Sequence, residues 1–96
     1  MILSLKRFHL KEDADEAAFL EADERLQREF TNKQPGLIRC TTAKGVDGAW
    51  LVLHEWASAE AADGPSGATG GPAVEAWMDF IDESTASIER FETVDR

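Results

Sequence analysis

Two histidines are the side chains in this sequence best suited to acid–base chemistry. His9 and His54 each stand near the end of a predicted strand. An imidazole titrates near neutral pH, so it can bind a metal ion or exchange a proton with a phenolic hydroxyl. If the two strands are parallel neighbours about 4.8 Å apart, both rings project from one face near the same pocket mouth. We therefore take His9 and His54 as candidate catalytic residues.

A metal site would need a carboxylate in phase with these histidines. Glu55 is adjacent to His54 in the sequence, but neighbouring residues of a strand point to opposite faces. Two histidines without an in-phase acid do not make a metal motif, so we expect no metal ion and no other cofactor. The alternative interpretation is a pair of partly buried, hydrogen-bonded histidines beside the core.

Three tryptophans could form the walls of a pocket. Indole rings can sandwich a flat substrate, and their N–H groups can orient its oxygen. We expect Trp50 and Trp77 to line a substrate pocket and Trp56 to act with the histidines, although tryptophans on a central strand or an amphipathic helix are also common core residues. Arg39 could hold an anionic group of the substrate through two hydrogen bonds, or form an ion pair at the surface or a dimer interface.

Cys40 is the only cysteine in the chain. It cannot form an internal disulfide, and no second thiol completes a metal knuckle. It has no neighbouring base and stands in a predicted strand, so we expect a buried, inert thiol. This cysteine usage is typical of a reduced, cytoplasmic protein.

These residues are positioned by alternating strands and helices, because the hydrophobic spacing switches between periods of two and 3.6 residues. The predicted order is strand, helix, strand, strand, helix, strand. The elements are a strand at 2–10, a helix from Ala14 to about Asn32 capped by Asp13, strands at Leu37 to Ala43 and Ala49 to Trp56, a helical turn from Ser58 to Ala62, a helix from Pro72 whose apolar stripe reaches Ile81, and a strand from about Ser87 to Val94. Residues 64–72 hold four glycines and two prolines, which predict a mobile loop that could cover a pocket.

This order predicts an α+β fold, a single ferredoxin-like βαββαβ domain over residues 1–96. Right-handed crossovers place both helices on one face of a four-stranded antiparallel sheet, with the first and third strands in the centre. Both faces of the first strand carry large apolar groups, since Leu3 and Leu5 alternate with Ile2 and Phe8. The face without helices would expose these groups to water, so the sequence predicts a homodimer that packs sheet against sheet.

With this element order, the chain resembles the dimeric α+β barrel superfamily, and within it the small antibiotic-biosynthesis-monooxygenase-like proteins. The resemblance covers nearly all of the chain and includes two short segments, QPGL at 34–37 and LVLHEWASAEA at 51–61. It implies a homodimer with a pocket between sheet and helices in each subunit. It also implies activity on a flat aromatic molecule, because some members oxidise polycyclic phenols to quinones without metal or flavin, while others degrade haem.

The sequence departs from that pattern at several places. Val52 stands four residues before Trp56, where quinone-forming members have an asparagine, and the second helix contains no histidine. Two further hypotheses therefore stay open beside a cofactor-independent oxygenase. One is a non-catalytic ligand-binding or stress-response dimer, and the other is a purely structural dimer.

The charge balance argues against two classes of partner. Nineteen acidic and ten basic residues give a net charge of -9, which repels nucleic-acid phosphates and anionic lipid surfaces. No apolar run approaches the roughly 20 residues of a spanning helix, and the opening segment lacks the order of a signal peptide. We expect neither nucleic acid nor membrane as a partner, and a small hydrophobic ligand instead.

Overall fold

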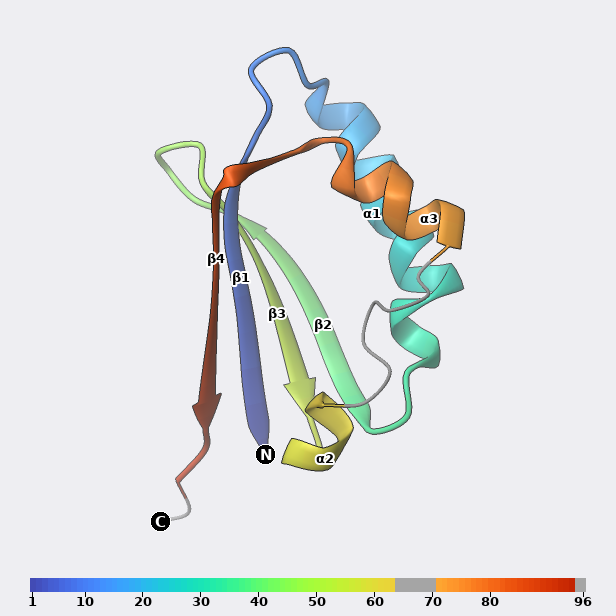
Figure 1. The fold of residues 1–96 in the computed structure, drawn as a ribbon, viewed down its shortest axis with the longest axis vertical. Coiled ribbons are helices and arrows are strands. Elements are labelled where there is room, and N and C mark those ends of the chain that lie inside the picture. The colour runs from blue at the N-terminus through green and yellow to red at the C-terminus, as the bar shows by residue number, and fades with distance from the viewer. Residues whose placement is uncertain (64–70, 95–96) are drawn as a thin grey trace.

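The computed structural model of this chain describes residues 1–63 and 71–94. A four-stranded sheet carries the helical elements on one face (Figure 1). The elements are β1 (Ile2–Leu10), α1 (Glu16–Glu29), the 3-10 turn η1 (Thr31–Lys33), β2 (Leu37–Lys44), β3 (Trp50–Trp56), α2 (Ala59–Ala62), α3 (Gly71–Met78) and β4 (Ile81–Glu92). The predicted α+β, ferredoxin-like arrangement is confirmed.

The strand order is β2-β3-β1-β4, and each neighbouring pair is antiparallel. The first and third strands are central, as predicted, but the expectation that they run parallel is wrong. The β2–β3 hairpin reverses the chain after α1 has brought β2 into the direction of β1, so β3 must oppose β1. Ser4 consequently pairs with His54, whereas His9 pairs with Asp82 at the other end of β1.

Several element boundaries differ from the predicted ones. Helix α1 is capped by Asp15 rather than Asp13, because the Asp15 carboxylate accepts a hydrogen bond from the Ala17 N–H at 3.1 Å. Ile81 does not continue the helical stripe of α3 but begins β4, where it pairs with Leu10 and is almost fully buried. The Ser58 cap of α2 is confirmed, since its hydroxyl accepts from the Ala61 N–H.

The glycine-rich segment predicted over 64–72 is only partly covered by the structure. Residues 64–70 lie outside the described residues, and with them most of the predicted loop. Gly71 and Pro72 open helix α3, which agrees with the expected helix start at Pro72.

The core fills one end of the space between sheet and helices. Its rings meet edge to face: Phe19 lies 5.1 Å from Trp50 between centroids, and Phe8 lies 5.3 Å from Trp77. The buried members of this cluster are Phe8, Phe19, Trp50, Val52, Trp77 and Ile81. Trp50 and Trp77 are therefore both core residues, as the alternative interpretation predicted, and Trp77 also borders a cavity.

The opposite face of the sheet carries no helix in the described part of the chain (Figure 1). Leu3 and Leu5 of β1, with Leu51 and Leu53 of β3, alternate with the buried residues of the same strands and point to this side. We call it the open face. No helix among the described residues has the length and hydropathy needed to cross a membrane.

Candidate functional site

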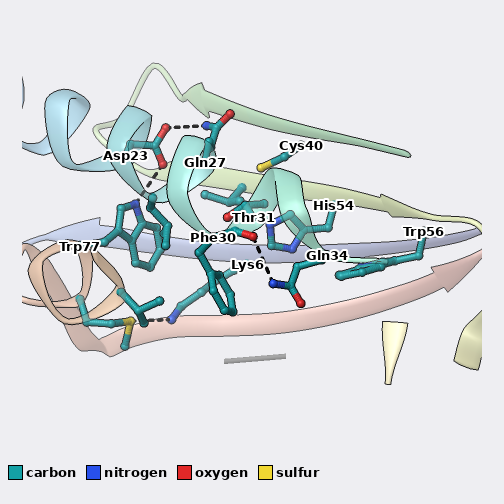
Figure 2. Close-up of a pocket in the computed structure, with 14 residues that line it drawn as sticks. Lys6, Asp23, Gln27, Phe30, Thr31, Gln34, Cys40, His54, Trp56 and Trp77 are labelled. Carbon is teal, nitrogen blue, oxygen red and sulfur yellow. Dashed lines mark hydrogen bonds between the residues drawn. The ribbon is translucent and has the colours of Figure 1, made fainter. Parts of the chain in front are cut away.

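A cavity of about 260 Å³ lies beside the core, between the sheet and the helices (Figure 2). Its floor comes from three neighbouring strands and its roof from α1, η1 and α3. The floor residues are Lys6, Cys40, Val52, His54 and Trp56. The roof residues are Asp23, Leu26, Gln27, Phe30, Thr31, Gln34, Val74, Trp77 and Met78.

The alternation of β3 places His54 on the cavity floor. Val52 and Trp56, two residues before and after it, point the same way and are buried. The imidazole contacts Trp56 edge to face, with ring centroids 5.9 Å apart and planes at 74°. In the described cavity wall, the hydrogen bonds join other residues and none reaches His54 (Figure 2). The expectation of a hydrogen-bonded structural histidine is thus not met at this position.

Burial sets the protonation state of His54. It lowers the pKa of the imidazole below its ordinary value of 6.5, and the negative charge of Asp23 opposes this shift only in part. The ring is therefore neutral at pH 7. A neutral imidazole has one N–H donor and one nitrogen acceptor, and both are available to a molecule in the cavity.

Asp23 is the most constrained polar group of the cavity wall. It is 6% exposed, yet its carboxylate accepts three hydrogen bonds from three different elements. The donors are Trp77 Nε1 at 3.0 Å, Thr42 Oγ1 at 2.8 Å and Gln27 Nε2 at 2.9 Å. This network joins α1 to β2 and α3, and it holds the Trp77 ring against the cavity.

Cys40 lies beside His54 on the floor, since their Cα atoms are partners in the β2–β3 ladder. Burial, with a smaller contribution from Asp23, raises the pKa of the Cys40 thiol to about 11. The thiol is protonated at neutral pH and is a poor nucleophile. This agrees with the inert thiol expected from the sequence.

The predicted site residues separate into two groups. His54, Trp56 and Trp77 line the cavity together, whereas Trp50 lies in the filled core and not in the cavity wall. His9 is exposed on the open face at the far end of β1, so the prediction that it shares a pocket mouth with His54 is wrong. Arg39 is also exposed on the open face, where its Cα is the ladder partner of the Glu55 Cα, and it does not line the cavity.

Sequence reasoning missed Asp23 and Lys6, although both carry a pattern that could have indicated them. Asp23 stands four residues after Phe19, on the apolar stripe of α1, where a carboxylate is out of place unless it is bonded. Lys6 stands two residues before the buried Phe8 on β1 and therefore points toward the helices, as Phe8 does. In residues 1–63 and 71–94, no three histidine, cysteine or acidic side chains gather closely enough to hold a metal ion.

No protein-family model matches the sequence, and no curated protein matches it. Solved structures do match. SnoaB, a cofactor-independent oxygenase from Streptomyces nogalater, is 19% identical with a TM-score of 0.73, and the match covers 99% of this chain and 94% of SnoaB. A candidate antibiotic biosynthesis monooxygenase from Caulobacter crescentus is 20% identical with a TM-score of 0.79, over 98% and 90% of the two chains.

A structure named antibiotic biosynthesis monooxygenase matches over 99% of this chain and all of its own length, with 14% identity and a TM-score of 0.76. At these identities the likeness concerns the backbone and not the chemistry. The chain has the fold of the antibiotic biosynthesis monooxygenase-like proteins, as the resemblance predicted.

Proposed function

We propose that this chain is a dimeric, cofactor-independent oxygenase-like protein that binds a flat, hydroxyl-bearing aromatic molecule in the cavity under α1 and α3. The observation that carries the proposal is the neutral His54 imidazole, which faces an apolar cavity and has no hydrogen-bond partner among the described residues. The ring is half-buried and its nitrogen atoms are open to the cavity, so a ligand hydroxyl can pair with them.

The walls of the cavity suit a planar apolar molecule. Phe30, Trp56 and Trp77 present ring surfaces, and Leu26 and Val74 add aliphatic contacts. The volume of about 260 Å³ lies just below the roughly 300–1,000 Å³ of pockets for drug-sized ligands. A ligand of two or three fused rings fits this volume better than a larger polycycle.

The chemistry follows from a hydroxyl placed against the free imidazole nitrogen. His54 would accept the phenolic proton, and the electron pair left on oxygen would delocalise to a ring carbon. That carbon would reduce O₂ and form a hydroperoxide, whose loss of water leaves a quinone carbonyl. The balance is one CH₂ group (the keto tautomer) plus O₂ giving one C=O plus H₂O. Apolar walls would keep bulk water from the carbanion during this step.

Turnover and binding can be tested on the purified protein with anthrone and 2-naphthol. We expect 2-naphthol to quench tryptophan fluorescence with one site per chain, and anthrone to be converted to anthraquinone with one O₂ consumed. His54→Phe keeps an aromatic ring of similar size and removes the nitrogen atoms, so it should abolish turnover. His9→Phe makes the same change on the open face and should not affect turnover. Absence of naphthol binding would overturn the proposal.

A ligand-binding protein without catalysis is the second candidate, and two observations favour it. Val52 occupies the floor position where the resemblance places an asparagine, and the lowered pKa makes His54 a weaker base. On this alternative, 2-naphthol binds one site per chain, but anthrone oxidation stays at the rate of the His54→Phe variant.

Dimerisation through the open face is supported by its apolar side chains. Leu3, Leu5, Leu51 and Leu53 form a patch across the two central strands, and Phe91 of β4 is 48% exposed beside Leu3. A second copy would remove this patch from water.

Sedimentation equilibrium tests the dimer. We expect a dimer for the unmodified chain and a monomer for Leu5→Glu with Leu53→Glu, two changes at paired positions of the open face. Leu20→Glu, which changes an exposed leucine of α1, is the control and should remain dimeric. A monomer at high concentration for the unmodified chain would contradict sheet-to-sheet packing.

A further inference from the structure

We infer that the cavity selects aromatic ligands that carry an acidic group, and that Lys6 is the residue that recognises this group. The inference rests on the proposed function, because it names the class of ligand: a hydroxylated aromatic carboxylate rather than a neutral phenol. The contacts of Lys6, its charge and its position relative to His54 carry the argument.

Among the described residues that line the cavity, Lys6 alone has a cationic side chain. Its side chain is 22% exposed, and its ammonium lies 5.4 Å from the centre of the Trp77 ring. The nearest polar contacts are the Met78 Sδ at 3.8 Å and a carboxylate oxygen of Glu83 at 3.4 Å. Charge-assisted N–H···O bonds are normally about 2.7–2.9 Å long, so neither contact is a strong one.

The acids near Lys6 leave room for a ligand carboxylate. Glu83 is 52% exposed, so solvent weakens its pairing with Lys6 and the carboxylate can turn away at little cost. Asp23, the acid in the described lining of the cavity, is already bonded to Trp77, Gln27 and Thr42. A ligand carboxylate would therefore meet an ammonium whose present partners are weak.

Lys6 and His54 are spaced as two anchors for one molecule. Ser4 is the partner of His54 in the β1–β3 ladder, and Lys6 follows Ser4 by two residues on the same face. Such diagonal neighbours have Cα atoms roughly 7–8 Å apart. Lys6 reaches toward α3, where its ammonium lies 3.8 Å from the Met78 Sδ, and the His54 ring lies apart from it in the cavity (Figure 2). A ring system lying along the floor could place a carboxylate at Lys6 and a hydroxyl at His54.

The test compares two probes that differ by one carboxylate, 6-hydroxy-2-naphthoic acid and 2-naphthol, by calorimetric titration at 0.15 M salt. We expect the acid to bind roughly tenfold more tightly than the naphthol, the effect of one charge-assisted hydrogen bond. Lys6→Met keeps the aliphatic stem and should reduce the ratio to about one or below. Lys33→Met removes an exposed lysine of η1 that does not line the cavity, and it should leave the ratio unchanged.

Removal of the competing acid sharpens the test. Glu83→Gln should strengthen binding of the naphthoic acid and leave 2-naphthol binding as it was. If 2-naphthol binds as well as the acid, or if Lys6→Met keeps the preference, the role of Lys6 is overturned while the aromatic site stands. If neither probe binds, the proposed function fails and this inference fails with it.

Discussion

The same strands line both ends of the space between sheet and helices, but one end is filled with side chains and the other holds a cavity. At one end Phe8 and Trp50 project from β1 and β3 into a closed aromatic cluster. At the other end the same strand alternation presents Lys6 and His54, and a cavity remains. Period-two alternation thus decides which side chains face the helices, while the volume of those side chains and the helices above decide whether the space is filled.

The helical layer differs between the two ends as well. Over the filled end, Phe19 of α1 is fully buried and contacts the rings of both β-strand and α3 residues. Over the cavity, α1 ends at Glu29 and a 3-10 turn follows, which leaves Phe30 only half-buried. The cavity lies where α1 ends, because the side chains that follow the helix do not fill the space above the strand residues of the floor.

The largest expected effect is the difference in stability loss between substitutions at the filled end and at the cavity end. Phe19→Ala should lower the free energy of unfolding by about 3–5 kcal/mol, because it opens a void in a closed core. Phe30→Ala should cost only about 1 kcal/mol, because its ring already borders an open cavity and is half-buried. Urea unfolding of the two variants measures the difference. Equal losses would mean that the cavity end is as tightly packed as the core.

The second prediction concerns Asp23, which links the two ends. Asp23→Ala should cost about 2–3 kcal/mol, because the Trp77 N–H then loses its acceptor in a buried place and the bonds from Gln27 and Thr42 to the carboxylate are lost as well. Glu24→Ala, the adjacent position on α1, removes only an exposed ion pair with Arg28 and should change stability by less than about 0.5 kcal/mol. Both are measured by urea unfolding, and similar losses for the two variants would deny Asp23 its structural role.

The smallest effect is the pH dependence that His54 brings to the cavity end. Its pKa is lower in the folded chain than in the unfolded chain, where it is near 6.5. As the pH falls below 6.5, the unfolded state binds a proton that the folded state does not, so stability falls through this window and is recovered at higher pH. His54→Phe should remove this part of the dependence, whereas His9→Phe should keep it.

Proton NMR checks the same residue directly. The titration midpoint of the His54 ring should lie below 6.5, and Asp23→Asn should lower it further, because the charge of Asp23 raises the pKa of His54. A midpoint at or above 6.5 would contradict the burial of a neutral imidazole on the cavity floor.

Much of the fold could be predicted from local patterns. The Ser58 cap, the β2–β3 hairpin and the Pro35-Gly36 turn are each specified by a few adjacent residues. Gly36 adopts a φ of 80°, and a Cβ there would collide with the Ala61 side chain, so this turn requires glycine for both reasons. The start of β4 was missed because Ile81 satisfies the helical spacing and the strand spacing equally well.

The candidate site was predicted less well than the fold. His54, Trp56 and Trp77 were found because their residue types are typical of pockets, whereas His9 was misplaced because the direction of β3 relative to β1 was misjudged. Lys6 and Asp23 were missed because charged residues are usually at the surface, and only their neighbours in space keep them inside.

The sequence by itself determined the order of strands and helices, the apolar side chains on both faces of the central strands, and the chemical groups available to the cavity. Only the tertiary structure decided which of those groups meet. Asp23 and Trp77, far apart in the chain, share a hydrogen bond of 3.0 Å, and burial lowers the pKa of His54. Alternation and capping are local properties of a chain, whereas burial and electrostatic environment depend on segments that only folding brings together.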